Sequence, residues 1–356
     1  MERLKGGKQQ GVDLITLNNG EIECRICPTR GMGLIDAWRG PVRLGWDSPV
    51  GEIVHPSFVN LESRGGLGWL EGFNEWVVRC GLESAGAPGR DRFITNQGDE
   101  AEMNLTLHGK IANIPASEVE ILVQCAPPYR IRVIGRVFEW MLFGPKLELR
   151  TEVWTTPGSN ILHLEDTVTN RGSHNQEFQL IYHCNHGTPL LEDGARFLAP
   201  VQRVFPINPH AARKVDRYDL FEAARTGFVE EVYCLEPIGD SEGKTTVMLR
   251  NHKGNRAAAM RYRVSELPCL TLWKNTAAEE DGYVAGLEPG TGFPYNRSIE
   301  RRFGRVPILA GGESRSFRID FLLLDSTSEV DETARLISAV QKGRKTQIDH
   351  SPPDLG

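Results

Sequence analysis

The chain has 356 residues, of which 40% are hydrophobic and 25% are charged, a composition typical of a globular protein. Its 41 basic and 47 acidic residues leave a net charge of -6, which argues against a general binder of nucleic-acid phosphates, since such a protein needs a basic face. No apolar run approaches the ~20 residues of a membrane span, and the N-terminus lacks the hydrophobic stretch of a secretory signal. We therefore expect a cytoplasmic protein that binds neither nucleic acid nor a membrane.

Seven cysteines are scattered along the chain, and an odd number fits reduced thiols better than a disulfide framework. Cys24 and Cys27 form a C-x-x-C pair, but no second pair follows at the spacing of a zinc site. The surrounding segment 21–27 reads EIECRIC and alternates like a strand, which would point the two thiols to opposite faces. We therefore expect both cysteines to be structural, and we predict no metal site.

The segment 51–98 differs from the rest of the chain. It is rich in glycine and tryptophan and shows little alternation, as in GGLGWLEGFNEW. Long irregular segments on a β scaffold tend to build binding sites rather than core. This pattern therefore favours a role for the segment in a binding site.

From residue 101 onward the chain is dominated by period-two alternation of polar and apolar residues, the pattern of half-buried strands. Turn signals such as Pro127-Pro128 and Gly144-Pro145 separate the alternating segments. Strand after strand joined by short turns predicts an all-β fold, a large antiparallel β-sandwich. The predicted strands cover 101–111, 117–125, 129–140, 146–156, 160–170, 177–183, 229–235, 244–250, 257–264, 268–274, 283–288 and 315–324.

One segment near the C-terminus follows helical spacing instead. Residues 328–343 carry apolar side chains at positions 330, 334, 337 and 340, which predicts an amphipathic C-terminal helix. Ser328 is the expected N-cap, and the helix is expected to end at Gly343. A second, shorter helix is predicted at 210–224.

The chain contains no linker, low-complexity block or clear internal repeat. We therefore expect one domain over residues 1–345. The tail at 346–356 reads TQIDHSPPDLG, which is polar and proline-rich. We expect this tail to be disordered.

The segment 180–191, LIYHCNHGTPLL, is an apolar strand-like run that carries two imidazoles and an amide. Alternation would place His183 and Asn185 on one face of the strand and His186 on the other, beside the break at Gly187. Taken alone, His183 reads as a hydrogen-bonded core histidine and His186 as a structural or rim residue. The functional alternative is that His183 and Asn185 face a cleft.

Three other apolar strands carry polar residues at comparable places. Glu288 precedes a glycine-rich loop, Trp273 and Lys274 lie within CLTLWKN, and His108 comes directly before a glycine. Each also fits an ordinary role by itself, such as a solvated strand end for Glu288 or a core aromatic for Trp273. Several polar residues at the ends of apolar strands together indicate one shared concave site.

These motifs resemble those of the aldose 1-epimerase, or galactose mutarotase-like, superfamily. The matching pieces are LHG at 107–109, LEDTVTNRGSHNQEFQLIYHCN at 164–185 and GLEP at 286–289. Their order and spacing carry the resemblance, which extends over most of the chain. It implies the large β-sandwich of that superfamily, the galactose mutarotase-like supersandwich, over the expected domain.

Residue by residue, the resemblance implies that His183 is the general acid, Glu288 the general base and His108 a contact of the sugar. Members of the superfamily carry an early Asn-Arg pair, for which only Arg79 is a plausible counterpart here. Their His-Gly-Gly is His-Gly-Lys in this chain, and Asn185 and His186 stand where aromatic residues are usual. These departures fall on substrate contacts, so they concern the identity of the sugar more than the type of reaction.

The implied reaction exchanges the α and β anomers of a small-molecule carbohydrate. It transfers no electron or group, so it requires no cofactor, and one acid and one base suffice. Trp273 could stack on the C–H face of the sugar ring. Lys274, Arg79 and His108 could bind hydroxyls or an anionic substituent, and Asn185 is a further expected substrate contact.

Two other functions are compatible with the same fold. A non-catalytic carbohydrate-binding or sensor protein would not need the acid–base couple that His183 and Glu288 supply. A glycoside hydrolase or lyase would usually need two facing carboxylates, and only Glu288 occupies a convincing position. Glu165 and Asp166 read as a surface and turn pair. The sequence therefore favours an isomerase of the aldose 1-epimerase type.

Overall fold

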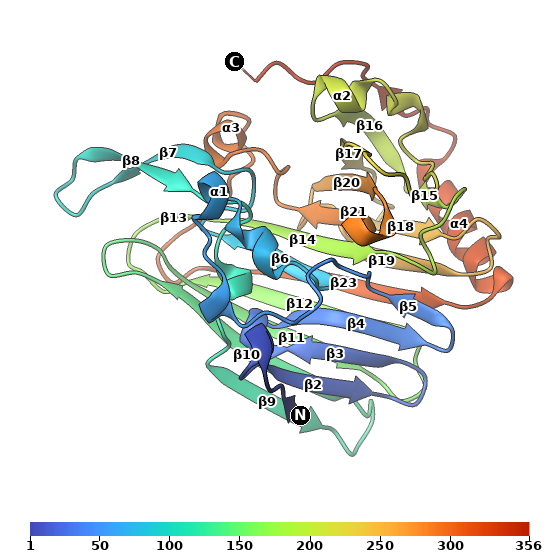
Figure 1. Cartoon of the computed structure of the whole chain (residues 1–356), viewed down its shortest axis with the longest axis horizontal. Coiled ribbons are helices and arrows are strands. Elements are labelled where there is room, and N and C mark those ends of the chain that lie inside the picture. Colours follow the sequence, from blue (N-terminus) through green and yellow to red (C-terminus); the bar gives the residue numbers. More distant parts are fainter. Residues whose placement is uncertain (356) are drawn as a thin grey trace.

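The computed structural model describes residues 1–355, and most of its elements are β-strands gathered into two large sheets (Figure 1). The larger sheet has twelve strands in the order β1-β2-β3-β4-β6-β14-β21-β20-β17-β16-β24, with β5 paired to β4. Neighbouring strands in it are antiparallel except for β16 and β24. The bounds are β1 Glu2–Arg3, β2 Asp13–Asn18, β3 Glu23–Cys27, β4 Gly33–Arg39, β5 Val42–Leu44, β6 Val77–Leu82, β14 Gln179–His186, β16 Val201–Pro206, β17 Glu231–Pro237, β20 Cys269–Thr276, β21 Tyr283–Gly290 and β24 Gln347–Ile348.

The second sheet has eight antiparallel strands in the order β15-β18-β19-β23-β12-β11-β10-β9. Two small sheets accompany it, the pair β13–β22 and the hairpin β7–β8, which projects from the body of the molecule in Figure 1. The bounds are β7 Gly89–Ile94, β8 Glu100–Leu105, β9 Glu118–Val123, β10 Ile131–Trp140, β11 Lys146–Thr155, β12 Ile161–Asn170, β13 Gln176–Glu177, β15 Arg196–Leu198, β18 Lys244–Arg250, β19 Ala257–Arg263, β22 Ile308–Leu309 and β23 Ser314–Leu324.

Helices are few and mostly short. No helix in residues 1–355 is long and apolar enough to cross a bilayer. The α-helices are α1 Ser63–Gly66, α2 Pro209–Ala212, α3 Arg297–Arg302 and α4 Thr327–Gln341, and the 3-10 turns are Gly7–Gln9, Pro28–Arg30, Pro56–Phe58, Gly68–Gly72, Ile111–Asn113, Val215–Arg217 and Glu279–Asp281.

The main hydrophobic core lies between the two large sheets. Tyr182 of β14 and Leu164 of β12 belong to the same buried cluster, although their strands lie in different sheets. Trp76, which precedes β6, packs its ring 4.8 Å from that of Phe321 on β23. Alternation along each strand sends one set of side chains into this core and the other set outward. The predicted antiparallel β-sandwich with a C-terminal helix is confirmed.

Helix α4 is the predicted C-terminal helix, but its N-cap is Ser326 rather than Ser328. Ser326 has an extended backbone, and its hydroxyl accepts a hydrogen bond from the N–H of Glu329 at 3.3 Å. Glu329 in turn accepts hydrogen bonds of 2.8 and 2.9 Å from Arg39, which ties the start of the helix to β4. The cap therefore lies just after β23, where Glu329 of the first helical turn can reach Arg39 of β4.

The helix expected at 210–224 is broken into pieces. The chain forms α2, continues into the 3-10 turn Val215–Arg217 and then runs on without helical structure to residue 224. Lys214 stands between the two pieces with φ -125° and ψ 15°, outside the helical region. The prediction of one continuous helix is therefore wrong.

Part of the tail at 346–356, which was expected to be disordered, forms the short strand β24. Gln347–Ile348 pairs with β16, and Asp349 accepts a hydrogen bond from Arg203 at 2.7 Å. The edge of a sheet presents unpaired N–H and C=O groups, and here the tail takes up part of that edge. The last residue of the predicted tail, Gly356, lies outside the described residues.

The two cysteines of the C-x-x-C pair lie on opposite faces of the larger sheet, as predicted. Cys24 belongs to the main core and Cys27 to a separate cluster. All seven cysteines are free. Burial raises the pKa of Cys27 to about 12, so this thiol stays protonated and unreactive at neutral pH.

Candidate active site

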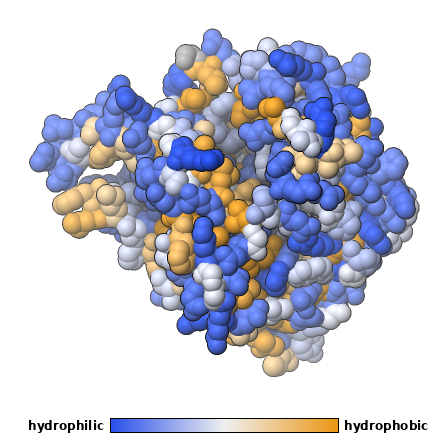
Figure 2. Space-filling model, viewed as in Figure 1, coloured by the Kyte–Doolittle hydropathy of each residue, from blue (hydrophilic) through white to orange (hydrophobic). Residues whose placement is uncertain are grey.

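Two neighbouring strands of the larger sheet, β14 and β21, bring an imidazole and a carboxyl group into contact. Cys184 pairs with Leu287, so the next positions, His183 and Glu288, stand opposite each other on the side of the sheet away from the main core. His183 Nε2 lies 3.2 Å from Glu288 Oε1, and the two residues are only 5% and 2% exposed. Figure 2 shows the surface hollowed near the middle of the molecule, above β14, β20 and β21 as they lie in Figure 1.

Asn185 holds the imidazole of His183 in one orientation. Its Nδ2 donates to the backbone carbonyls of Glu75, at 2.9 Å, and of His183, at 3.2 Å, which leaves Oδ1 as the acceptor. Oδ1 lies 2.7 Å from His183 Nδ1, so Nδ1 carries a proton and Nε2 is the nitrogen that faces Glu288. Asn185 is fully buried and both polar atoms of its side chain are engaged, so we expect it to position His183 rather than to contact a substrate as the sequence suggested.

Gly286 makes room for the carboxyl group of Glu288. The two residues lie on the same face of β21, and a Cβ at position 286 would be 2.4 Å from Glu288 Oε1 and 3.2 Å from Trp273 Cε3. A side chain at position 286 would therefore displace the carboxyl group of Glu288 from its place beside His183. Although Oε1 lies close to His183, it makes no well-aligned hydrogen bond within residues 1–355. This oxygen is available to a hydroxyl group of a ligand.

Aromatic rings enclose the pair. The centroid of the His183 ring lies 5.1 Å from that of Phe73, 5.3 Å from that of Trp273 and 5.9 Å from that of Trp69. Phe73 and Trp69 come from the glycine-rich segment 51–98, and Trp273 is the half-buried member of the group. Rings of this kind can cover the C–H faces of a sugar and keep water from the reacting groups.

His108 approaches the pair from the Leu-His-Gly turn. Its ring centroid lies 5.4 Å from that of His183 and 4.6 Å from that of Trp69. Its backbone adopts a left-handed conformation with φ 58°, and its Nδ1 donates to the carbonyl of Ala85 at 2.9 Å. Burial lowers the pKa of His108 to about 4, so its Nε2 is an acceptor at neutral pH.

Burial opposes charge on both members of the pair. It lowers the pKa of His183 well below the usual value, and the neighbouring His108 adds to this effect. It raises the pKa of Glu288 well above the usual carboxyl value, and the negative charge of Glu230 adds to that shift. Both shifts favour the neutral forms of the two groups, an imidazole on His183 and a carboxylic acid on Glu288.

Arg79 does not reach this site, although the sequence suggested it as a sugar contact. Its neighbours Val78 and Cys80 belong to the cluster around the aromatic rings, so alternation turns Arg79 into the main core. There its Nε lies 2.9 Å from Asp166 Oδ2, and both side chains are buried. The prediction is wrong for Arg79, and also for Asp166, which is an interior ion partner and not a surface residue.

Lys274 also points away from the site. Lys274 lies on the same face of β20 as Leu272, which belongs to the main core, whereas its neighbour Trp273 faces His183 on the other side of the sheet. Its Nζ donates to the carbonyl of Leu220 at 2.8 Å and lies 3.7 Å from Glu231 Oε2. Adjacent residues of a strand point to opposite faces, so Trp273 and Lys274 could not both have contacted the sugar.

Three residues around the pair were not identified individually from the sequence. Trp69 and Phe73 lie in the segment 51–98, whose composition indicated a binding role without naming side chains. Glu230 has no local signal at all, because it is an exposed residue directly before β17. Its hydrogen bond to Trp273 Nε1, at 2.7 Å, places it beside the site.

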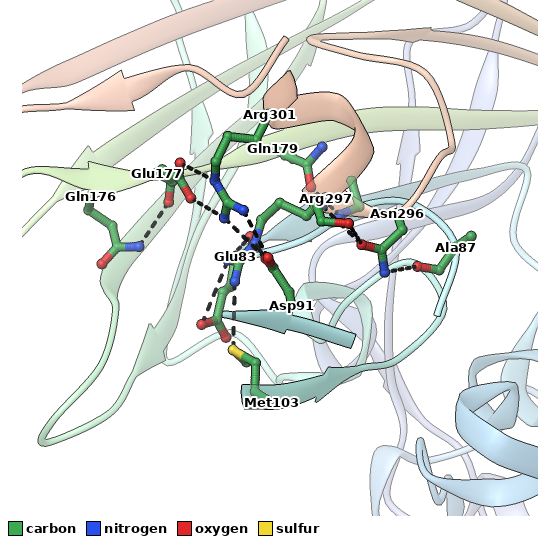
Figure 3. Close-up of polar contacts among 12 residues, drawn as sticks. Glu83, Ala87, Asp91, Met103, Gln176, Glu177, Gln179, Asn296, Arg297 and Arg301 are labelled. Carbon is green, nitrogen blue, oxygen red and sulfur yellow. Dashed lines mark hydrogen bonds and ion pairs between the residues drawn. The ribbon is translucent and has the colours of Figure 1, made fainter. Parts of the chain in front are cut away.

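An ion-pair network fastens the segment that follows Glu288 (Figure 3). Beyond β21 the chain enters α3, where Arg297 and Arg301 both bind Asp91 of β7. Arg301 also lies 2.7 Å from Glu177 of β13. Burial alone would raise the pKa of Asp91, but hydrogen bonds from the two arginines outweigh it and lower that pKa to about 2. The network thereby anchors the exit of β21 to the hairpin β7–β8.

The model of a domain of unknown function, DUF4432, matches residues 9–323. The chain belongs to the DUF4432 family. Comparison of this DUF4432 chain with curated proteins gave no significant match.

Solved structures place this DUF4432 protein among the galactose mutarotase-like folds. A Klebsiella pneumoniae protein with a provisional assignment as an aldose 1-epimerase is 39% identical, with a TM-score of 0.93, over 99% of this chain and 89% of that chain. A galactose mutarotase-like protein from Clostridium acetobutylicum is 15% identical, with a TM-score of 0.59, over 88% and 96%. A GalM/aldose epimerase homologue from C. elegans is 11% identical, with a TM-score of 0.55, over 89% and 100%. The resemblance read from the sequence is confirmed.

Proposed function

We propose that this protein is an aldose 1-epimerase, which exchanges the α and β anomers of a sugar through His183 and Glu288. The observation that carries the proposal is the 3.2 Å separation of His183 Nε2 and Glu288 Oε1, two atoms from strands far apart in the chain. Mutarotation needs an acid and a base within hydrogen-bond reach of two oxygens bonded to one carbon. The provisional assignment of the Klebsiella pneumoniae relative supports the same reaction.

Ring opening requires a proton on the ring oxygen and removal of the proton from the anomeric hydroxyl. In the proposed mechanism His183 Nε2 donates the first proton and Glu288 accepts the second. The carbonyl carbon then rotates, and the ring closes with the two roles exchanged, which restores both groups. The short separation of Nε2 and Oε1 lets the proton that rests on Glu288 pass to His183 before opening. No proton is consumed over the cycle.

Saturation-transfer NMR on a panel of aldoses tests this proposal directly, because it measures exchange between anomers at equilibrium. We expect the purified protein to accelerate exchange of at least one sugar above the spontaneous rate in the same buffer. Binding of sugars without accelerated exchange would contradict the proposal and favour a sensor. Release of new reducing ends from a glycoside would instead favour a hydrolase.

Replacing Asn185 by alanine should lower kcat for anomer exchange by about 10²-fold while leaving KM nearly unchanged. The substitution removes the acceptor that orients His183, and loss of orientation is costly even when the reacting groups remain. Asn185→Asp retains an oxygen acceptor and should recover part of the rate. Steady-state kinetics on both variants checks this, and a raised KM with unchanged kcat would return Asn185 to the role of a substrate contact.

Anomer exchange should persist at pH values below the ordinary range of histidine. The pair works while it holds one proton, so activity falls on the acid side only when His183 takes up a second proton, and burial has lowered that pKa well below 6.5. Activity falls on the alkaline side when Glu288 loses its proton, and that pKa is raised well above 4.5. Profiles of kcat/KM from about pH 4 to about pH 9 measure both limbs. An acid limb at the ordinary histidine pKa would contradict this account.

A further inference from the structure

We propose that the site accepts uncharged sugars and discriminates against phosphorylated or carboxylated ones, and that Glu230 is a specificity-determining residue at its rim. The inference rests on the proposed binding of sugar at this site, but it does not depend on turnover. It is carried by the hydrogen bond of Glu230 to Trp273, and by the direction in which the nearby cations point.

Glu230 holds a carboxylate beside the catalytic pair. Its Oε2 accepts a hydrogen bond of 2.7 Å from Trp273 Nε1. Cε3 of that indole and Oε1 of Glu288 lie close to Gly286, 3.2 Å and 2.4 Å from the position that a Cβ there would take. Within residues 1–355 Oε1 of Glu230 has no hydrogen-bond partner. A carboxylate can only accept hydrogen bonds, so this oxygen suits a sugar hydroxyl and repels a phosphate or a carboxylate.

The indole of Trp273 offers no compensation to an anion. It is the half-buried aromatic residue of the site, and its single N–H already donates to Glu230. An anionic substituent at this rim would therefore face the carboxylate of Glu230 and find no free N–H on Trp273 to bind it. A neutral hydroxyl can donate to the same carboxylate without disturbing the indole.

The basic side chains of β6, of β20 and of the turn Pro28–Arg30 are engaged elsewhere. Arg79 pairs with a buried aspartate in the main core, and Lys274 points to the opposite face of β20. Arg30 contacts the glycine-rich segment 51–98 at Gly72, but its guanidinium is fully buried and paired with Glu75. Burial keeps His108 neutral at pH 7. A charged sugar would thus lose hydration without gaining a counter-charge from these groups.

The experiment compares neutral sugars with anionic derivatives of the same sugar. Glucose and galactose are each tested against the corresponding 6-phosphate and uronic acid, by saturation-transfer NMR and by quenching of tryptophan fluorescence. We expect each neutral sugar that reacts to exceed its anionic counterparts by about ten-fold or more in kcat/KM, since like charges brought together are disfavoured. Glu230→Gln should lower this ratio several-fold, mainly by raising kcat/KM for the anionic sugars.

A matched control is Glu120→Gln, which removes the same charge from an exposed residue of β9 in the other sheet. It should leave the ratio unchanged. Anionic sugars that react as well as neutral ones, or a ratio that Glu230→Gln leaves intact, would overturn this inference while the epimerase proposal stands. Selective binding of neutral sugars without anomer exchange would overturn the epimerase proposal while this inference stands. No binding and no exchange across the panel would overturn both.

Discussion

Replacing Glu288 by glutamine is expected to lower the rate of anomer exchange by about 10²–10⁴-fold, the usual contribution of one positioned acid or base. Glutamine keeps the shape of the side chain over Gly286 but can neither accept nor return the proton of the anomeric hydroxyl. His183→Ala should cost a similar factor. The double variant should be little worse than either single variant, because the two groups act as one couple and their effects are not additive.

The measurement is saturation-transfer NMR on each variant, with the spontaneous rate subtracted. His174→Ala and Glu120→Gln make matched controls, since both residues are exposed and lie on other parts of the fold. They should retain the wild-type rate. Retention of more than about a tenth of that rate by Glu288→Gln would show that this carboxyl group is not the base.

Replacing Arg79 by methionine is expected to lower the free energy of unfolding by about 3–5 kcal/mol. Asp166 would be left without its partner at a position where it is 0% exposed, and burial of an unpaired charge is strongly unfavourable. The hydroxyl of Thr151 still donates to Asp166 at 2.6 Å, but a neutral donor does not replace the guanidinium. Urea unfolding followed by fluorescence measures the change.

The double variant Arg79→Met with Asp166→Leu distinguishes a structural role of Arg79 in the buried ion pair from a role in binding the sugar. Replacing both partners by apolar groups removes the orphaned charge, so most of the lost stability should return. Anomer exchange by the folded fraction should remain near the wild-type rate in both variants, because Arg79 lies on the other face of β6. A large rise in KM with unchanged stability would contradict this placement.

The predictability of individual strands depended on how deeply they are buried. Strands β10 and β12 are more deeply buried on one face than on the other, and the sequence alternates accordingly. Strand β6, VVRCGL, is buried on both faces, so it shows no alternation and was missed within the segment 51–98. The tail could not be predicted either, because its structure depends on the free edge of β16.

Strand periodicity in the sequence predicts which residues of a strand can share the site, but not which other segments reach it. Alternation separates His183 from His186, and in the same way it places Trp273 and Lys274 on opposite faces of β20. No local pattern, however, marks Glu230. Its part in the site follows from a contact with a residue 43 positions away in the chain.

The amino-acid sequence by itself determined the class of the fold, because period-two alternation dictates which side chains of a strand can be buried. It also determined which strands carry an imidazole and a carboxyl group. Only the tertiary structure decided that His183 and Glu288 meet, that Arg79 and Lys274 turn away from them, and that Asn185 serves as a positioning residue. Those outcomes depend on strand register and sheet order, which arise from packing between segments distant in sequence.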